Sequence, residues 1–147
     1  MPTVGEYMTP SPYTIGDDQP LERAHAMMRE HQIRHLPVLH GGKLVGIVSM
    51  GDLHLLETLG SEELGAVKIE EAMTAEPYVV GPSAPLQKVA AEMAEHKYGT
   101  AIVSDGRKVV GIFTTIDALR ALTDALRGRH AKNSNTRVPP SADPRNR

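Results

Sequence analysis

An internal repeat constrains the fold of this chain more than any other feature of its sequence. When the sequence is compared with itself at an offset of 65 residues, two segments of about 50 residues align without a gap. One opens with Met8-Thr9 and the other with Met73-Thr74. Identical residues then recur in register, and they include Gly16 and Gly81, Pro20 and Pro85, Leu21 and Leu86, Met28 and Met93, Val38 and Val103, Gly46 and Gly111, and Asp52 and Asp117. Two unrelated βα stretches of ordinary composition would not keep this register, so the chain is predicted to hold two copies of one unit.

Each copy is predicted to fold as β-α-β-β-α. Short β-rich runs at 13–15 and 78–80 are each closed by a glycine, and helices begin soon after, near Pro20 and Pro85. These helices carry one apolar face, formed by Leu21, Ala24 and Met28 in one copy and by Leu86, Val89, Ala90 and Met93 in the other. The remaining elements are strands at 36–39, 44–48, 101–103 and 109–113, joined in pairs by hairpin turns, and second helices that begin near Asp52 and Asp117 and end near Gly60 and Gly128.

The predicted fold class is therefore α/β (α+β), with two tandem units packed sheet to sheet in pseudo-two-fold symmetry. A single copy with a three-stranded sheet has too little core to be stable alone. The predicted organisation is a first motif at 1–60, a connector at 61–68, a second motif at 69–127 and a disordered basic tail at 128–147.

Composition and charge exclude several classes of function. The chain has no cysteine, which excludes disulfides, thiolate zinc sites and thiol catalysis. No apolar stretch approaches the roughly 20 residues of a membrane span, and the N-terminus lacks the layout of a secretory signal, so a cytoplasmic protein is predicted. Residues 1–126 carry 10 basic and 17 acidic residues, a net charge of -7, whereas residues 127–147 carry six basic residues and one acid, a net charge of +5. The acidic body argues against nucleic acid as the main partner.

The repeated motifs resemble those of the CBS family, whose tandem pairs form the Bateman module. The resemblance covers about residues 4–125 and rests on Met8-Thr9 and Met73-Thr74, on the matching stretches 44–52 and 109–117, and on Ile33-Arg34-His35-Leu36-Pro37-Val38. The second copy departs from the family pattern at Tyr98-Gly99-Thr100. The resemblance implies a regulatory sensor with clefts between its motifs that bind an adenosine-containing ligand: AMP, ADP, ATP or S-adenosylmethionine.

In the family pattern Ser/Thr-x-x-Asp, the aspartate holds the ribose hydroxyls and the serine or threonine faces phosphate. The resemblance therefore assigns these roles to Asp52 with Ser49 and to Asp117 with Thr114. The chemistry is reasonable in itself, because a carboxylate accepts both hydrogen bonds of a vicinal diol and a helix start favours an anion. The same pattern is also typical of helix capping, so a structural role stays open beside ligand binding.

Further candidates for the clefts are residues that could line an adenine slot or could instead be ordinary core: Thr14, Ile15, Leu36, Pro37, Val79, Val80, Ala101 and Ile102. Arg34 and His35 could meet phosphates, whereas Gly99 and Thr100 at the matching positions offer no charge. If phosphate charge contributes to binding, the two clefts should differ in ligand or affinity.

No catalytic constellation is visible, so the chain is predicted to be neither an enzyme nor the carrier of a catalytic cofactor. A P-loop, a Gly-x-Ser-x-Gly motif and a paired-carboxylate motif are all missing from the sequence. His31 and His35 are four residues apart, but the helix is predicted to end near Gln32, so no metal site is predicted there. Met27, Met28 and Met93 are predicted to fill the core.

The predicted partners are a small adenosyl ligand, a regulated protein that the sequence does not identify, and a second copy of the chain. The resemblance suggests that two chains associate through helical faces, with the apolar side of residues 117–126 as a plausible contact, although core packing could consume that face. The alternatives are a dimerisation module without ligand, a nucleic-acid regulator acting through the basic tail, and weak nucleotide hydrolysis.

Overall fold

A computed structural model describes residues 2–58, 66–106 and 108–128 of the chain. The described residues form two compact units. One unit spans Pro12–Pro77, and the other combines residues 2–11 with residues 78–128. We call them the β4 unit and the β8 unit after their longest strands. The packing of one sheet on the other stays a prediction. The predicted helix end at Gly60, most of the connector and most of the basic tail lie outside the described residues.

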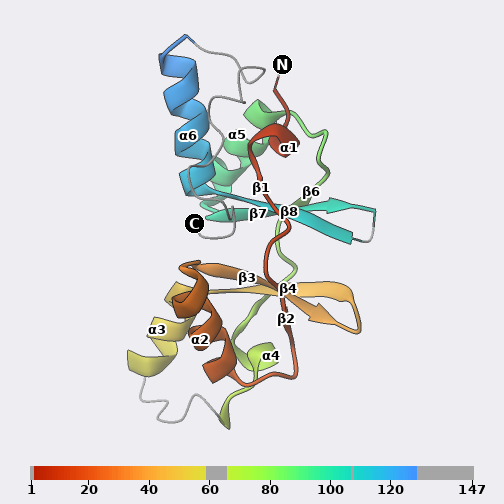
Figure 1. Ribbon diagram of the computed structural model, residues 1–147, viewed down its shortest axis with the longest axis vertical. Helices are drawn as coiled ribbons and strands as arrows, with labels where there is room; N and C mark the ends of the chain where they lie inside the picture. Colours follow the sequence, from red (N-terminus) through yellow and green to blue (C-terminus); the bar gives the residue numbers. More distant parts are fainter. Residues whose placement is uncertain (1, 59–65, 107, 129–147) are drawn as a thin grey trace. The chain divides into compact units, whose positions relative to one another are not determined.

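The β4 unit contains one mixed four-stranded sheet in the order β2-β3-β4-β5 (Figure 1). Its elements are β2 (Ile15–Gly16), α2 (Leu21–His31), β3 (His35–His40), β4 (Lys43–Ser49), α3 (Met50–Thr58), α4 (Ile69–Ala72) and β5 (Thr74–Ala75). Strand β2 runs parallel to β3, and β3 forms the predicted hairpin with β4.

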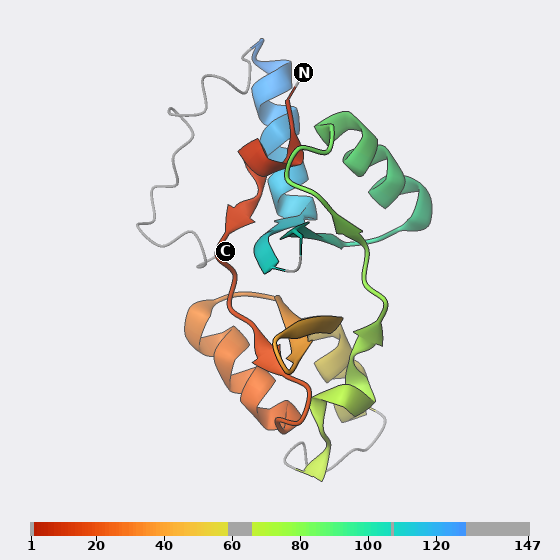
Figure 2. The same ribbon diagram turned by 90° about the vertical axis from the view of Figure 1, so that its right-hand side faces the viewer.

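The β8 unit repeats this arrangement with the strand order β1-β8-β7-β6. Its elements are α1 (Val4–Tyr7), β1 (Thr9–Pro10), β6 (Val79–Val80), α5 (Leu86–His96), β7 (Thr100–Asp105), β8 (Lys108–Thr114) and α6 (Thr115–Leu126). Figure 2 shows the N-terminal helix α1 beside the long helix α6 within this unit. The mixed α/β fold and its duplication are as predicted.

The sheets have four strands instead of the predicted three, because the opening of each repeat joins the sheet of the other repeat. Strand β1 pairs antiparallel with β8, with Thr9 opposite Ile112, and β5 pairs with β4, with Thr74 opposite Ile47. The boundaries of the compact units therefore differ from the boundaries of the sequence repeats. The predicted motif limits refer to the repeats and stay a prediction.

Two glycines in register allow these exchanged strands to approach closely. A Cβ atom on Gly46 would lie 2.8 Å from the carbonyl oxygen of Thr74 and 2.6 Å from Sδ of Met73. A Cβ on Gly111 would collide with Met8 and lie 3.1 Å from the carbonyl oxygen of Thr9. The presence of glycine at 46 and 111 is thus explained by the close approach of the neighbouring strand, which only a residue without a side chain permits.

Each unit has its own hydrophobic core, built on the predicted apolar helix faces. Leu21, Ala24 and Met28 are buried in the β4 unit, where they belong to one cluster with buried residues of β3, β4 and α3. Leu86, Val89 and Met93 are buried in the β8 unit, and the predicted Ala90 is half-buried. The prediction that Met27, Met28 and Met93 are core residues is confirmed.

None of the helices in the described ranges is long and apolar enough to span a membrane.

Candidate functional site

One pair of predicted site residues lies face to face at the same place in each unit, where the first hairpin strand begins and the second one ends. In the β4 unit His35 opens β3 opposite Ser49 at the end of β4, and α3 begins at the next residue. In the β8 unit Thr100 opens β7 opposite Thr114, which is followed at once by α6. The backbone N–H of Met50 donates to the carbonyl of Arg34 at 2.9 Å, which ties the start of α3 to the loop before β3.

Ser49 and Asp52 form reciprocal hydrogen bonds at the start of α3. The backbone N–H of Ser49 donates to Oδ2 of Asp52 at 2.9 Å, and the backbone N–H of Asp52 donates to Oγ of Ser49 at 3.2 Å. The Ser49 hydroxyl also donates to Oδ2 of Asp52 at 3.1 Å. Among the residues that the structure describes, Oδ1 of this half-buried carboxylate has no hydrogen-bond partner. The capping role left open by the sequence is therefore present, and it uses one of the two carboxylate oxygens.

Thr114 and Asp117 form the same capping box at the start of α6, but both oxygens of Asp117 are engaged. The backbone N–H of Thr114 donates to Oδ2 at 3.0 Å. The hydroxyl of Thr9 lies 3.3 Å from each oxygen, and Nη1 of Arg120 lies 3.3 Å from Oδ1. Asp117 is only 2% exposed. The two matched aspartates thus differ in access, because one is covered by its neighbours and the other is not.

His35 is the titratable group beside Asp52. Burial lowers the pKa of His35 below its ordinary value, and the positive charge of Arg34 lowers it further, whereas Asp52 acts in the opposite direction. His35 is therefore predominantly neutral at neutral pH, and an anion bound beside it would favour its protonated form. At the matching position of the β8 unit, Oγ1 of Thr100 is buried and has no hydrogen-bond partner among the described residues.

The model of the CBS domain family matches residues 4–55 and 69–124 of the chain. The chain belongs to the CBS domain family. Its structure is similar to the CBS domain pair of protein MJ0100, solved in complex with 5'-methylthioadenosine and S-adenosylmethionine, with a TM-score of 0.77 and 28% identity over 85% of this chain and 98% of that one. It is also similar to CBSX2 in complex with AMP, with a TM-score of 0.73 and 30% identity over 85% of this chain and 98% of that one.

One relative of this CBS protein is a much longer enzyme, of which only a part matches the chain. Inosine-5'-monophosphate dehydrogenase of Korarchaeum cryptofilum is 34% identical over 105 residues, which are 71% of this chain. The match takes in 21% of that enzyme. The similarity therefore concerns the CBS pair, and the activity of the dehydrogenase is not transferred to this chain.

The apolar candidates of the CBS motifs divide into buried and accessible side chains. Ile15, Leu36, Pro37, Ala101 and Ile102 are buried, and Ile15, Leu36 and Ala101 belong to the hydrophobic cores, so any contact of those three with a ligand would use mainly backbone atoms. Thr14 and Val80 are half-buried, and Val79 is exposed. Arg34 and Gly99 are exposed at the loops before β3 and β7. Ile15 lies on β2 beside β3, and Val79 and Val80 lie on β6 beside β7; the role of all these residues in binding stays a proposal.

Two side chains of this region, Thr9 and Arg120, were not predicted as site residues. Thr9 belongs to the Met-Thr opening of the first repeat, whereas Asp117 belongs to the second repeat, 108 residues away. No local sequence pattern therefore connects the two residues. Arg120 follows Asp117 at i+3, a helical spacing that could have indicated the ion pair.

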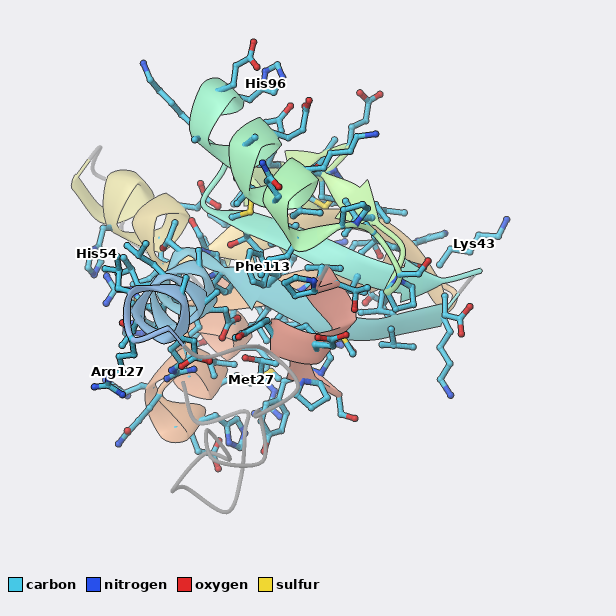
Figure 3. All side chains as sticks on the ribbon, turned by 90° about the horizontal axis from the view of Figure 1, so that it is seen from above. Met27, Lys43, His54, His96, Phe113 and Arg127 are labelled. Atoms are coloured by element: carbon cyan, nitrogen blue, oxygen red, sulfur yellow. The ribbon has the colours of Figure 1, made fainter. Side chains whose placement is uncertain are left out.

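His31 and His35, whose spacing of four residues would suit a metal on a continuous helix, do not lie on one helix. Helix α2 ends at His31, whose ring stacks on Tyr13 with 3.9 Å between centroids, whereas His35 lies on β3. Glu92, Glu95 and His96 on α5 do bring their ligand atoms within 4.8 Å of one another, a grouping that the sequence reading did not single out. Figure 3 shows His96 pointing outward from α5. These side chains are largely exposed, and His96 is already paired with Glu92 at 3.3 Å, so we assign no metal to them.

Proposed function

We propose that this CBS protein is a regulatory module that binds an adenosine-containing ligand beside Asp52. The observation that carries the proposal is the half-buried carboxylate of Asp52. Ser49 holds one of its oxygens in place, and the other has no hydrogen-bond partner in the described part of the chain. A fixed carboxylate of this kind can accept hydrogen bonds from the two hydroxyls of a ribose.

The surroundings of Asp52 suit the rest of such a ligand. The N-terminus of α3 favours an anion, and Arg34 and His35 lie on the adjoining loop and strand. Thr14 and Ile15, next to β3, would contribute to an adenine slot. The similar MJ0100 pair and CBSX2 bind S-adenosylmethionine, 5'-methylthioadenosine or AMP, which supports this ligand class for the present chain. We further propose that the module acts without catalysis in the cytoplasm and reports ligand binding to a separate protein.

Ligand binding is expected to raise the melting temperature, since a molecule that binds only the folded state stabilises it. AMP, ATP and S-adenosylmethionine should be tested in turn by thermal melting and by calorimetric titration. Asp52→Asn should weaken binding about 10- to 100-fold, because a charged hydrogen-bond acceptor contributes about 1.5–3 kcal/mol. Asp18→Asn, on an exposed loop of the same unit, is the matched control and should change neither measurement. The proposal is wrong if none of the three ligands raises the melting temperature at millimolar concentration, or if Asp52→Asn binds as tightly as the wild type.

We also propose that two copies associate through α6. Ala118 and Ala121 pack against the core, but four large apolar side chains of the same helix remain exposed: Ile116, Leu119, Leu122 and Leu126, with exposed fractions between 49% and 78%. Their spacings of three and four residues place them on one face of the helix. Among the residues that the structure describes, the core therefore leaves this face uncovered. An apolar helix face of this size is typical of a protein interface, and a second copy would cover it with the same residues.

Leu119→Glu is expected to turn the dimer into a monomer. The substitution removes an apolar side chain from the centre of the exposed face and adds a charge that a paired copy would have to bury, so association should weaken at least about tenfold. Light scattering coupled to size-exclusion chromatography measures the molar mass directly. Gln87→Glu adds the same charge at an exposed position of α5 and should leave the mass unchanged. A wild-type chain that runs as a monomer would contradict the proposal, as would a Leu119→Glu variant that keeps the dimer mass.

A further inference from the structure

The N-terminal segment, residues 2–11, is fastened to the β8 unit along its whole length. The backbone N–H groups of Val4 and Gly5 donate to the carbonyls of Ala84 and Pro82, each at 2.9 Å. At the other end, the N–H of Ser11 donates to the carbonyl of Val110 at 3.0 Å. Between these anchors the segment forms α1 and β1, and β1 pairs with β8. The segment therefore crosses the unit beside α6, as Figure 2 shows.

Two hydroxyl groups of this segment bind carboxylates of α6. The hydroxyl of Tyr7 donates to Oδ2 of Asp124 at 2.9 Å, and the hydroxyl of Thr9 lies 3.3 Å from both oxygens of Asp117. Tyr7, Thr9 and Asp117 are all buried. Asp117 is the matched counterpart of Asp52, so Thr9 lies where the ribose hydroxyls of a ligand would have to lie.

The β4 unit has no equivalent of this arrangement. The residues matched to Tyr7 and Thr9 are Ala72 and Thr74. Ala72 has no hydroxyl group, and Thr74 is exposed, with no side-chain hydrogen bond to Asp52 among the described residues. The two units therefore differ at matched positions: the carboxylate of Asp117 is covered, and that of Asp52 is accessible.

From this difference we infer that the N-terminal segment is a latch on the Asp117 site, and that Thr9 determines which of the two CBS motifs binds ligand first. The inference rests on the proposed adenosyl-binding function. A ribose can hydrogen-bond both oxygens of Asp117 only after the Thr9 hydroxyl leaves them and Nη1 of Arg120 leaves Oδ1, whereas a ribose reaches Oδ1 of Asp52 without displacing a hydrogen-bonded side chain of the described residues. Binding at Asp52 is therefore the tighter event. Binding at Asp117 releases residues 2–11 from α6 and so makes this segment responsive to ligand.

The latch is tested with AMP as the probe, by calorimetric titration of variants in which the Asp52 site is weakened and the Asp117 site is intact. Asp52→Asn weakens the accessible site, and Thr9→Val added to it removes the competing hydroxyl while keeping a β-branched side chain in β1. The double variant should bind AMP about tenfold more tightly than Asp52→Asn alone. Thr74→Val in the same background is the matched control and should have no effect. Equal affinities for the Thr9→Val and Thr74→Val variants overturn the latch.

Amide hydrogen exchange tests the latch in proteins that keep Asp52 unchanged. Without ligand, Thr9→Val and Tyr7→Phe should each speed amide exchange in residues 4–11, and Thr74→Val should not. In the wild type, AMP should speed exchange in the same residues only at concentrations that fill the weaker site. Unchanged exchange in all of these cases overturns the latch even if binding at Asp52 is confirmed. If AMP binds neither the wild type nor any variant, the proposed ligand class fails for AMP and the latch is overturned with it.

Discussion

Phe113→Ala is expected to lower the free energy of unfolding of the β8 unit by about 3–5 kcal/mol. Phe113 is completely buried in β8 and is the largest of the fully buried side chains of the described residues. It packs in one cluster with Val4 and Tyr7 of the N-terminal segment and with Leu86, Val89 and Met93 of α5. Figure 3 shows it in the interior of the unit. Truncation would leave a cavity that rigid strands and helices around it can fill only in part.

Urea denaturation followed by circular dichroism measures this loss. Phe113→Leu keeps most of the volume and should cost less than about 1.5 kcal/mol. Val48 occupies the matched, equally buried position of the β4 unit, so Val48→Ala should affect mainly the transition of that unit. A Phe113→Ala variant within about 1 kcal/mol of the wild type would show that the core of the β8 unit is not organised around this ring.

The second large effect is expected for Gly46→Ala, which should destabilise the β4 unit by about 1–3 kcal/mol and loosen β5. The added Cβ would lie 2.8 Å from the carbonyl oxygen of Thr74, closer than van der Waals contact permits, so β4 and β5 must separate. Because β5 pairs with β4 through only two residues, a small separation removes much of that pairing. In an ordinary exposed strand, the same substitution would be neutral or stabilising.

Amide exchange at Thr74 and Ala75 together with urea denaturation tests this expectation. Gly81→Ala is the control, because a Cβ at that position meets no atom within 4 Å and its backbone does not require a glycine. Gly111→Ala should reproduce the effect in the β8 unit, since its Cβ would meet Met8 and the backbone of Thr9. Unchanged exchange at Thr74 and Ala75 in Gly46→Ala would mean that the pairing of β5 with β4 is absent in solution.

The proposed latch links these structural features to function. Gly111 lets β1 pair closely with β8, and this pairing holds Thr9 against Asp117. A variant that loosens β1 should therefore also uncover Asp117. Stability and ligand access are expected to change in opposite directions in the β8 unit, whereas the β4 unit, whose Asp52 is already accessible, should lose only stability.

The duplication, the order of the main strands and helices, and the position of both Ser/Thr-x-x-Asp motifs could be predicted from the sequence alone. These features are local, or they repeat in register, so they can be recognised without knowing what lies nearby. The end of α2 is an example: it was predicted near Gln32, and the residue after His31 does adopt a left-handed conformation with φ 56°. The capping role of Ser49 and Thr114 was likewise visible as one of two interpretations.

The sheet that each opening segment joins, and the carboxylate that is covered, could not be predicted from the sequence. Strands β1 and β5 have two residues each, too few to specify a pairing partner by their own pattern, and their partners lie far away in the sequence. The contact of Thr9 with Asp117 spans 108 residues. Nearly identical motifs therefore have different environments. Thr9, from a distant segment, covers Asp117, whereas the matched Thr74 is exposed and makes no side-chain hydrogen bond to Asp52 among the described residues.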